Sequence, residues 1–138
     1  MLWFQVRELL DLGADPNDRD VNSRQTLSAL HWASWKGRVT VVRELLAHGA
    51  DHASVNKWGK TPLHWAAIVG SVECGTVLFR QGNCDLDARN KQGRTACHLA
   101  SADGRPEFVS WLIESGADIT LLDGAGHTAY DLGKFCLI

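Results

Sequence analysis

Thr61-Pro62-Leu63-His64-Trp65-Ala66-Ala67 is a stretch that returns along this chain. It recurs as Ser28-Ala29-Leu30-His31-Trp32-Ala33-Ser34, as Thr95-Ala96-Cys97-His98-Leu99-Ala100-Ser101 and, in degenerate form, as Thr128-Ala129-Tyr130-Asp131-Leu132. The histidines of the first three copies are 33 and 34 residues apart. A fixed period of this length is typical of stacked supersecondary units.

A second motif keeps the same period. Gly13-Ala14-Asp15, Gly49-Ala50-Asp51 and Gly116-Ala117-Asp118 each end an apolar run, and Gly82-Asn83-Cys84-Asp85 is a version with one inserted residue. The glycine spacings are 36, 33 and 34. Two motifs interleaved in one register indicate a genuine internal repeat.

One repeat, residues 56–89, shows what each unit is expected to form. A turn at 57–60 precedes Thr61, whose hydroxyl can accept from the first free amides of a helix. A second helix is predicted over 72–81, with Gly82 closing it in the left-handed conformation that glycine adopts most easily. Each helix pair has too little apolar surface to be stable alone, so neighbouring units must stack into a solenoid.

With these motifs placed, the chain resembles the ankyrin repeat family, whose signature includes T-P-L-H-x-A in a repeat of 33 residues. The resemblance implies an all-α solenoid of stacked helix-turn-helix units with turn and loop fingers. It covers one domain over residues 1–138: a partial repeat (2–19), three repeats (about 20–55, 56–89 and 90–122) and a closing partial repeat (123–138).

Three departures from the pattern are notable. The first turn, residues 18–27, has an insertion of three residues, and one extra residue falls near Asn83. Gly75 stands where sister helices have valine, which costs about 1 kcal/mol in helix propensity and removes a core side chain. We therefore expect residues 72–81 to be the softest interior helix, with faster hydrogen exchange than 106–115.

Both ends of the chain have bulky apolar residues where a terminal repeat normally has a polar face. We expect the chain to be a piece of a longer array, the alternative being ends that pack on something else.

The composition is that of a soluble globular domain, with 45% apolar residues and a net charge of −2. This charge favours neither nucleic acid nor an anionic membrane, and no apolar run reaches the roughly 20 residues that span a bilayer. The cysteines stand at apolar repeat positions, which predicts reduced thiols in the core. The expected location is intracellular, in the cytoplasm.

Catalytic and metal-binding interpretations of the sequence are weak. His48 and His52 have the spacing of a helical metal pair, but Gly49-Ala50-Asp51 ends the helix between them. Cys97 and His98 are adjacent, so their side chains point about 100° apart on a helix and cannot act as nucleophile and base. In the family the repeated histidine forms hydrogen bonds between adjacent turns. We expect no enzyme activity, cofactor or metal.

Five of the six tryptophans divide into two predicted classes. Trp32 and Trp65 occupy the position of Leu99 in the repeat, so they are predicted to be core residues, as is Trp111. The remaining candidates lie where the family presents its binding surface, on exposed first-helix positions and turn tips. These positions are Trp35, Lys36, Lys57, Trp58, Lys60, Ile68, Val69, Lys91, Gln92, Arg94, Ala102 and Asp103, with Gly124, Ala125 and His127 in the last turn and Asn22, Arg24 and Gln25 nearest in the first.

The predicted function is recognition of a protein partner by a non-catalytic module. Aromatic side chains dominate binding hot spots, and the cations of the turn tips favour an acidic, partly apolar segment. The alternative is a regulatory or targeting segment of a larger enzyme, channel or ubiquitin-ligase adaptor. The sequence identifies neither the partner nor the oligomeric state.

Overall fold

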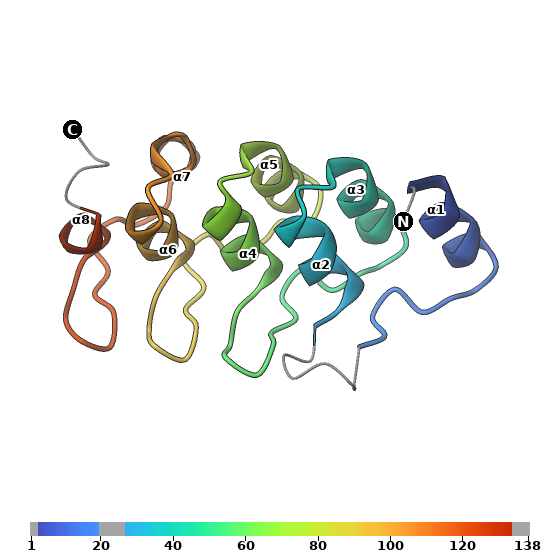
Figure 1. Cartoon of the computed structure of the whole chain (residues 1–138), viewed down its shortest axis with the longest axis horizontal. Coiled ribbons are helices and arrows are strands. Elements are labelled where there is room, and N and C mark those ends of the chain that lie inside the picture. Colours follow the sequence, from blue (N-terminus) through green and yellow to red (C-terminus); the bar gives the residue numbers. More distant parts are fainter. Residues whose placement is uncertain (1–2, 20–26, 134–138) are drawn as a thin grey trace.

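The computed structural model describes residues 3–19 and 27–133, which stack into an elongated solenoid (Figure 1). These residues form helices and no strand, apart from an isolated bridge between Arg19 and Ser28. The predicted all-α repeat solenoid is therefore confirmed. The helices are α1 (Trp3–Asp11), α2 (Ala29–Trp35), α3 (Val39–Ala47), α4 (Pro62–Val69), α5 (Val72–Arg80), α6 (Ala96–Ala102), α7 (Pro106–Ser115) and α8 (Ala129–Leu132).

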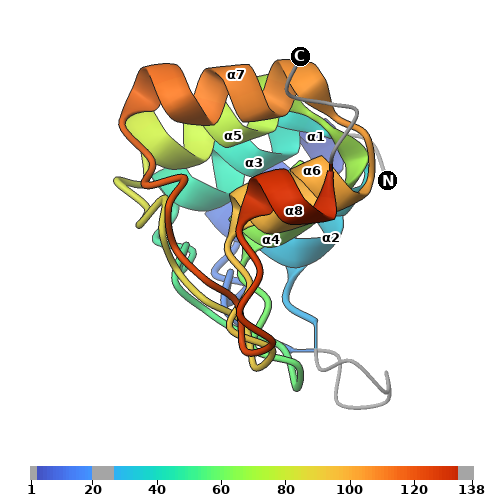
Figure 2. The same cartoon turned by 90° about the vertical axis from the view of Figure 1, so that its left-hand side faces the viewer.

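The helices lie in two parallel rows. The first helices of the units, α2, α4, α6 and α8, pack side by side, and the second helices, α1, α3, α5 and α7, form the other row. Seen along the solenoid, the turns project together from the row of first helices (Figure 2). The turn tips and the first helices thus share one side of the molecule.

Each first helix begins at a reciprocal cap. Ser28, Thr61, Thr95 and Thr128 are extended, and each side chain accepts from the backbone N–H three residues later. The side chain at that later position accepts the N–H of the capping residue in return. Both groups of the capping box are therefore satisfied in every unit.

The repeated histidine also joins each unit to the next. In His64 the Nδ1 atom accepts the N–H of Thr61 at 2.9 Å, so the proton of the neutral ring is on Nε2, which donates to the Arg94 carbonyl at 3.0 Å. His31 and His98 repeat this arrangement, donating to the carbonyls of Lys60 at 3.0 Å and His127 at 2.9 Å. The hydrogen bond between adjacent turns that the resemblance implied is confirmed.

The turns are held from inside and from their neighbours. Oδ1 of Asn56 accepts the N–H groups of Trp58 and Lys60, and Asn90 and Asp123 do the same in the next two turns. The N–H of Lys91 donates to the Trp58 carbonyl at 3.0 Å. The tips thus form a connected edge and not independent loops.

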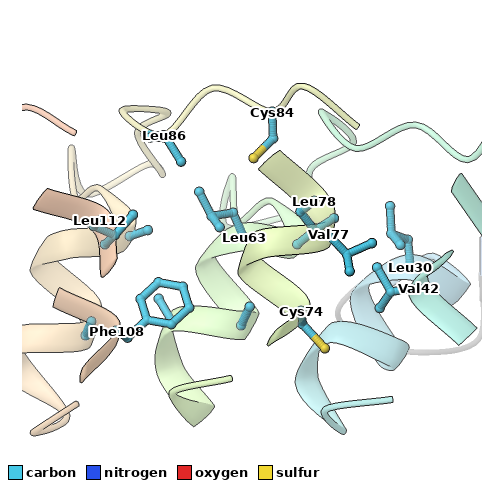
Figure 3. Packing of buried hydrophobic residues seen from close by; sticks show 14 of the residues in the cluster. Leu30, Val42, Leu63, Cys74, Val77, Leu78, Cys84, Leu86, Phe108 and Leu112 are labelled. Atoms are coloured by element: carbon cyan, nitrogen blue, oxygen red, sulfur yellow. The ribbon is translucent and has the colours of Figure 1, made fainter. Parts of the chain in front are cut away.

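The core fills the space between the two helix rows (Figure 3). Leu30 and Leu63 from the first helices meet Val42, Leu78 and Leu112 from the second. Three cysteines, Cys74, Cys84 and Cys97, are free and buried, as predicted. Burial raises the pKa of the Cys84 thiol to about 11, which makes it a poor nucleophile.

Gly75 does not leave the cavity that its missing side chain suggests. A Cβ added there would lie 2.9 Å from the Trp111 ring and 3.0 Å from the Phe108 ring. Trp111 is packed against the core, as predicted, and its ring fills the space. The expectation that residues 72–81 form the softest interior helix stays a prediction.

The prediction for Gly82 is wrong. Helix α5 ends at Arg80, and Asn83, not Gly82, has the left-handed backbone, with φ of 56°. The inserted residue moves the left-handed position one place along, to a residue type that tolerates it. Of the inserted first turn, residues 20–26, including Asn22, Arg24 and Gln25, lie outside the described residues.

Stability should fall with acidification because of His64. Burial lowers its pKa from 6.5 to about 4 in the folded chain. As the pH falls below 6.5, the unfolded chain binds the proton first, so the free energy of unfolding decreases until the folded chain is protonated near pH 4. The difference between the two pKa values corresponds to a loss of about 3 kcal/mol.

An NMR titration of the imidazole signals, combined with urea unfolding between neutral pH and pH 4, tests this expectation. A His64 ring that titrates near its ordinary value in the folded chain would contradict the assignment.

The tight approach of Trp111 to Gly75 predicts an overpacking effect. Gly75→Val should destabilise the fold by about 1–3 kcal/mol, since the added methyl groups must displace aromatic rings. In a Trp111→Leu background the same substitution should be less harmful, which a double-mutant cycle by chemical unfolding measures. Equal effects in both backgrounds would show that the ring does not occupy this space.

Candidate protein-binding surface

An aromatic row runs across the first helices. The rings of Trp32 and Trp35 on α2 have centroids 5.0 Å apart, and Trp35 lies 5.4 Å from Trp65 on α4. Trp35 is half-buried between its neighbours and Trp65 is buried. The row therefore bridges two adjacent repeat units through Trp35, a predicted site residue.

The core assignment of Trp32 is wrong, whereas that of Trp65 is confirmed. Trp32 is 39% exposed and Trp65 only 7%. Trp65 is covered by Trp35 from the preceding unit, but α2 is the first helix of its row among the described residues. The same repeat position is thus buried inside the row and exposed at its end.

Lysine side chains lie over this aromatic surface. The Nζ atom of Lys36 is 4.6 Å from the Trp35 ring centroid, and that of Lys60 is 4.9 Å from the Trp65 centroid. The Nζ atom of Lys57 is 4.9 Å from the ring centroid of Trp58, and Trp58 is 41% exposed at a turn tip. An ammonium group over an indole face is attracted by the ring quadrupole. The predicted basic tips and the predicted tryptophans therefore form one combined surface.

A hollow of about 370 Å³ opens between two neighbouring turns. It combines indole faces with ammonium and amide groups. Its lining residues are Trp58, Lys60, Trp65, Asn90, Lys91 and Gln92. Four of them were predicted as site residues, whereas Trp65 and Asn90 were missed because their repeat positions indicate a framework role.

Arg94 is not a free cation. Its Nε atom lies 3.2 Å from Oδ2 of Asp123, which is buried at the base of the following turn. The hydrogen bond from the N–H of His127 is the main cause that holds the pKa of Asp123 below its ordinary value, and Arg94 adds to it. The sequence comparison of tip positions missed this pairing, since Asp123 stands one place before the tip.

The other predicted residues contribute less distinctive chemistry. Ile68 and Val69 end α4 and are half-buried, with Ile68 packed against the core. Ala102 and Asp103 are exposed at the end of α6, one unit beyond the aromatic row. Gly124, Ala125 and His127 are exposed in the last turn. These positions extend the surface without adding an aromatic anchor.

Metal binding finds no support in the residues that the structure describes. His48 lies 3.0 Å from Asp11, and its hydrogen bond with the Glu44 carbonyl is the main cause that raises its pKa. No group of three or more His, Cys, Asp or Glu side chains within residues 3–19 and 27–133 is placed to hold a metal ion. Over the same part of the chain, no helix has the length and apolar character needed to cross a membrane.

The geometry defines a repeat protein of stacked helix pairs, and comparison with known families agrees. A family described as ankyrin repeats in three copies matches residues 30–123, most of the chain. The chain belongs to the ankyrin repeat family.

Three relatives are each much longer than this chain. It is 35% identical over 123 residues to the B-cell lymphoma 3 protein homolog of Mus musculus, covering 87% of this chain and 27% of that protein. It is 31% identical over 129 residues to palmitoyltransferase AKR1 of Lachancea kluyveri, a match that covers 90% of this chain and 17% of that protein. It is 34% identical over 103 residues to the E3 ubiquitin-protein ligase KEG of Arabidopsis thaliana, a match that covers 73% of this chain and 6% of that protein. The chain spans about a quarter or less of each.

Trp65 and Trp58 should contribute very differently to the free energy of unfolding. Trp65→Ala should destabilise the fold by about 3–5 kcal/mol because it empties a buried site. Trp58→Ala removes a ring from an exposed tip and should change the free energy of unfolding by less than about 1 kcal/mol. Chemical unfolding of both variants checks the contrast, and comparable losses would show that the tip ring belongs to the core.

Proposed function

We propose that this chain is a non-catalytic protein-interaction module that binds its partner through the first helices and the turn tips. The observation that supports this best is the pair of lysines placed over accessible tryptophans, Lys36 over the half-buried Trp35 and Lys57 over the exposed Trp58. Such a surface offers a large apolar area with few rotatable bonds, surrounded by positive charge. Its complement is an acidic, partly apolar protein segment.

The rigid frame supports this role. The turns at residues 56–60, 90–94 and 123–127 are held by internal hydrogen bonds and by a neighbouring turn, so their tips need little ordering when a partner binds. A preorganised surface loses less conformational entropy on association. Ankyrin repeats serve as protein-interaction modules, and the match to three copies of the repeat covers residues 30–123 of this chain.

A second function deserves testing, because the chain spans only 27%, 17% and 6% of the relatives described above. Two of these carry the names of a palmitoyltransferase and a ubiquitin-protein ligase. By this reading the chain is the regulatory or targeting segment of a larger protein. Sequencing of the full transcript decides between the two: further coding domains support the second function, and their absence supports a free-standing module.

We place the protein in the cytoplasm. Cys74, Cys84 and Cys97 are buried free thiols, which suits a reducing compartment. Microscopy of the tagged full-length protein tests this placement.

Partner binding should depend on the aromatic surface. Trp35→Ala and Trp58→Ala should each abolish capture of the partner from the source cell, since hot-spot aromatics supply about 2 kcal/mol or more of binding energy. Ile113→Ala is a matched control, because Ile113 is 46% exposed on α7 in the other helix row. Retained capture by both tryptophan variants, or equal loss in the control, would contradict the proposal.

A further inference from the structure

A hollow lies between the turn at residues 56–60 and the turn at residues 90–94, and we call it the inter-turn hollow. Its volume of about 370 Å³ is at the low end of the range for ligand sites, which suits one side chain of a partner with its adjoining backbone. The connection from the Lys91 N–H to the Trp58 carbonyl fixes the two turns relative to each other. The hollow is therefore a formed feature of the fold.

The lining combines two kinds of group. Trp58, which is 41% exposed, offers most of the indole surface, and the largely buried Trp65 adds a smaller part, which favours a bulky apolar side chain. Lys60 and Lys91 bring two ammonium groups, one from each turn, and none of the lining residues is acidic. Charge complementarity thus calls for an anionic group beside the apolar one.

The same geometry argues against a cationic ligand. Aromatic pockets bind alkylated ammonium groups through the ring face. Here the Nζ atom of Lys60 already lies 4.9 Å from the Trp65 centroid. A second cation would meet like charge from Lys60 and Lys91 with no carboxylate in the lining to offset it.

We propose that the inter-turn hollow binds a bulky apolar side chain of an extended peptide segment whose neighbouring residues are aspartate or glutamate. The apolar side chain packs between Trp58 and Trp65, and the flanking carboxylates pair with Lys60 and Lys91. This inference rests on the proposed function and adds the place and chemistry of one anchor point.

The test uses short synthetic peptides and NMR signals of the indole N–H groups in the intact chain. A leucine flanked by aspartates should shift the Trp58 and Trp65 signals at roughly millimolar peptide or below. The same peptide with lysines in place of aspartates, and one with trimethyllysine in place of leucine, should shift neither. Binding of the acidic peptide should weaken as salt is added.

Substitutions localise the site. Lys60→Gln should lower the affinity for the acidic peptide about threefold, which is the effect of losing one exposed charge pair. Trp58→Ala should lower this affinity by about tenfold or more. Lys60→Gln spares the backbone carbonyl that His31 uses, so the fold is preserved. Arg43→Gln removes one positive charge from an exposed position on α3, in the other helix row and outside the hollow, and should have almost no effect.

Several outcomes would overturn the inference: no shift with the acidic peptide, tighter binding of the lysine or trimethyllysine peptide, or equal weakening by Arg43→Gln and Lys60→Gln. Tryptophan rings and lysines can also bind single-stranded nucleic acid, by stacking on the bases and pairing with the phosphates. An oligothymidine probe tests this rival ligand, and binding of the probe that is tighter than binding of the acidic peptide also refutes the inference. The two proposals can fail separately. If the peptide test fails but Trp35→Ala still abolishes partner capture, the proposed function is supported and only this anchor point is refuted.

Discussion

The bond from a histidine Nε2–H to a backbone carbonyl of the next unit is the constraint on which the rest of the structure depends. The accepting carbonyls belong to Lys60, Arg94 and His127, each the residue directly before the next capping threonine. One imidazole therefore completes the cap of its own helix and fixes the point where the next turn enters the following helix. In the last unit Asp131 takes the histidine position and keeps the cap through its hydrogen bond from the Thr128 N–H.

This constraint also positions the candidate binding surface. Lys60 illustrates the connection, because its backbone carbonyl accepts from His31 while its ammonium group lies over Trp65. Arg94 has the same double role, with its carbonyl bound by His64 and its side chain paired with Asp123. Structural and recognition roles are thus divided between backbone and side chain of the same residue. The framework can remain unchanged while the displayed groups vary, which is how one fold can bind unrelated partners.

The fold could be predicted because the repeat specifies the same local contacts several times. The caps, the helix order and the role of the histidines follow from residue types at fixed spacing. Periodicity failed where a position depends on its neighbours in space. Trp32 and Trp65 share a repeat position, yet within residues 3–19 and 27–133 only Trp65 has a preceding first helix in its row to cover it. In the same way, the insertion near Asn83 moves the left-handed residue away from Gly82.

The candidate site was predictable in part. Its tip lysines and Trp58 follow from the matched turn positions, whereas the hollow between two turns is a property of their packing. Asp123 was missed as a partner of Arg94 because its repeat position elsewhere carries asparagine, which forms the same turn without the charge.

The most direct measurement of the central constraint is the tautomeric state of the histidines. Long-range proton–nitrogen NMR spectra at neutral pH distinguish the two ring nitrogens of His31, His64 and His98. Our account predicts that each ring is neutral with its proton on Nε2 and that this proton is protected from exchange with water. Rings protonated on Nδ1, or averaging freely between the two forms, would contradict it.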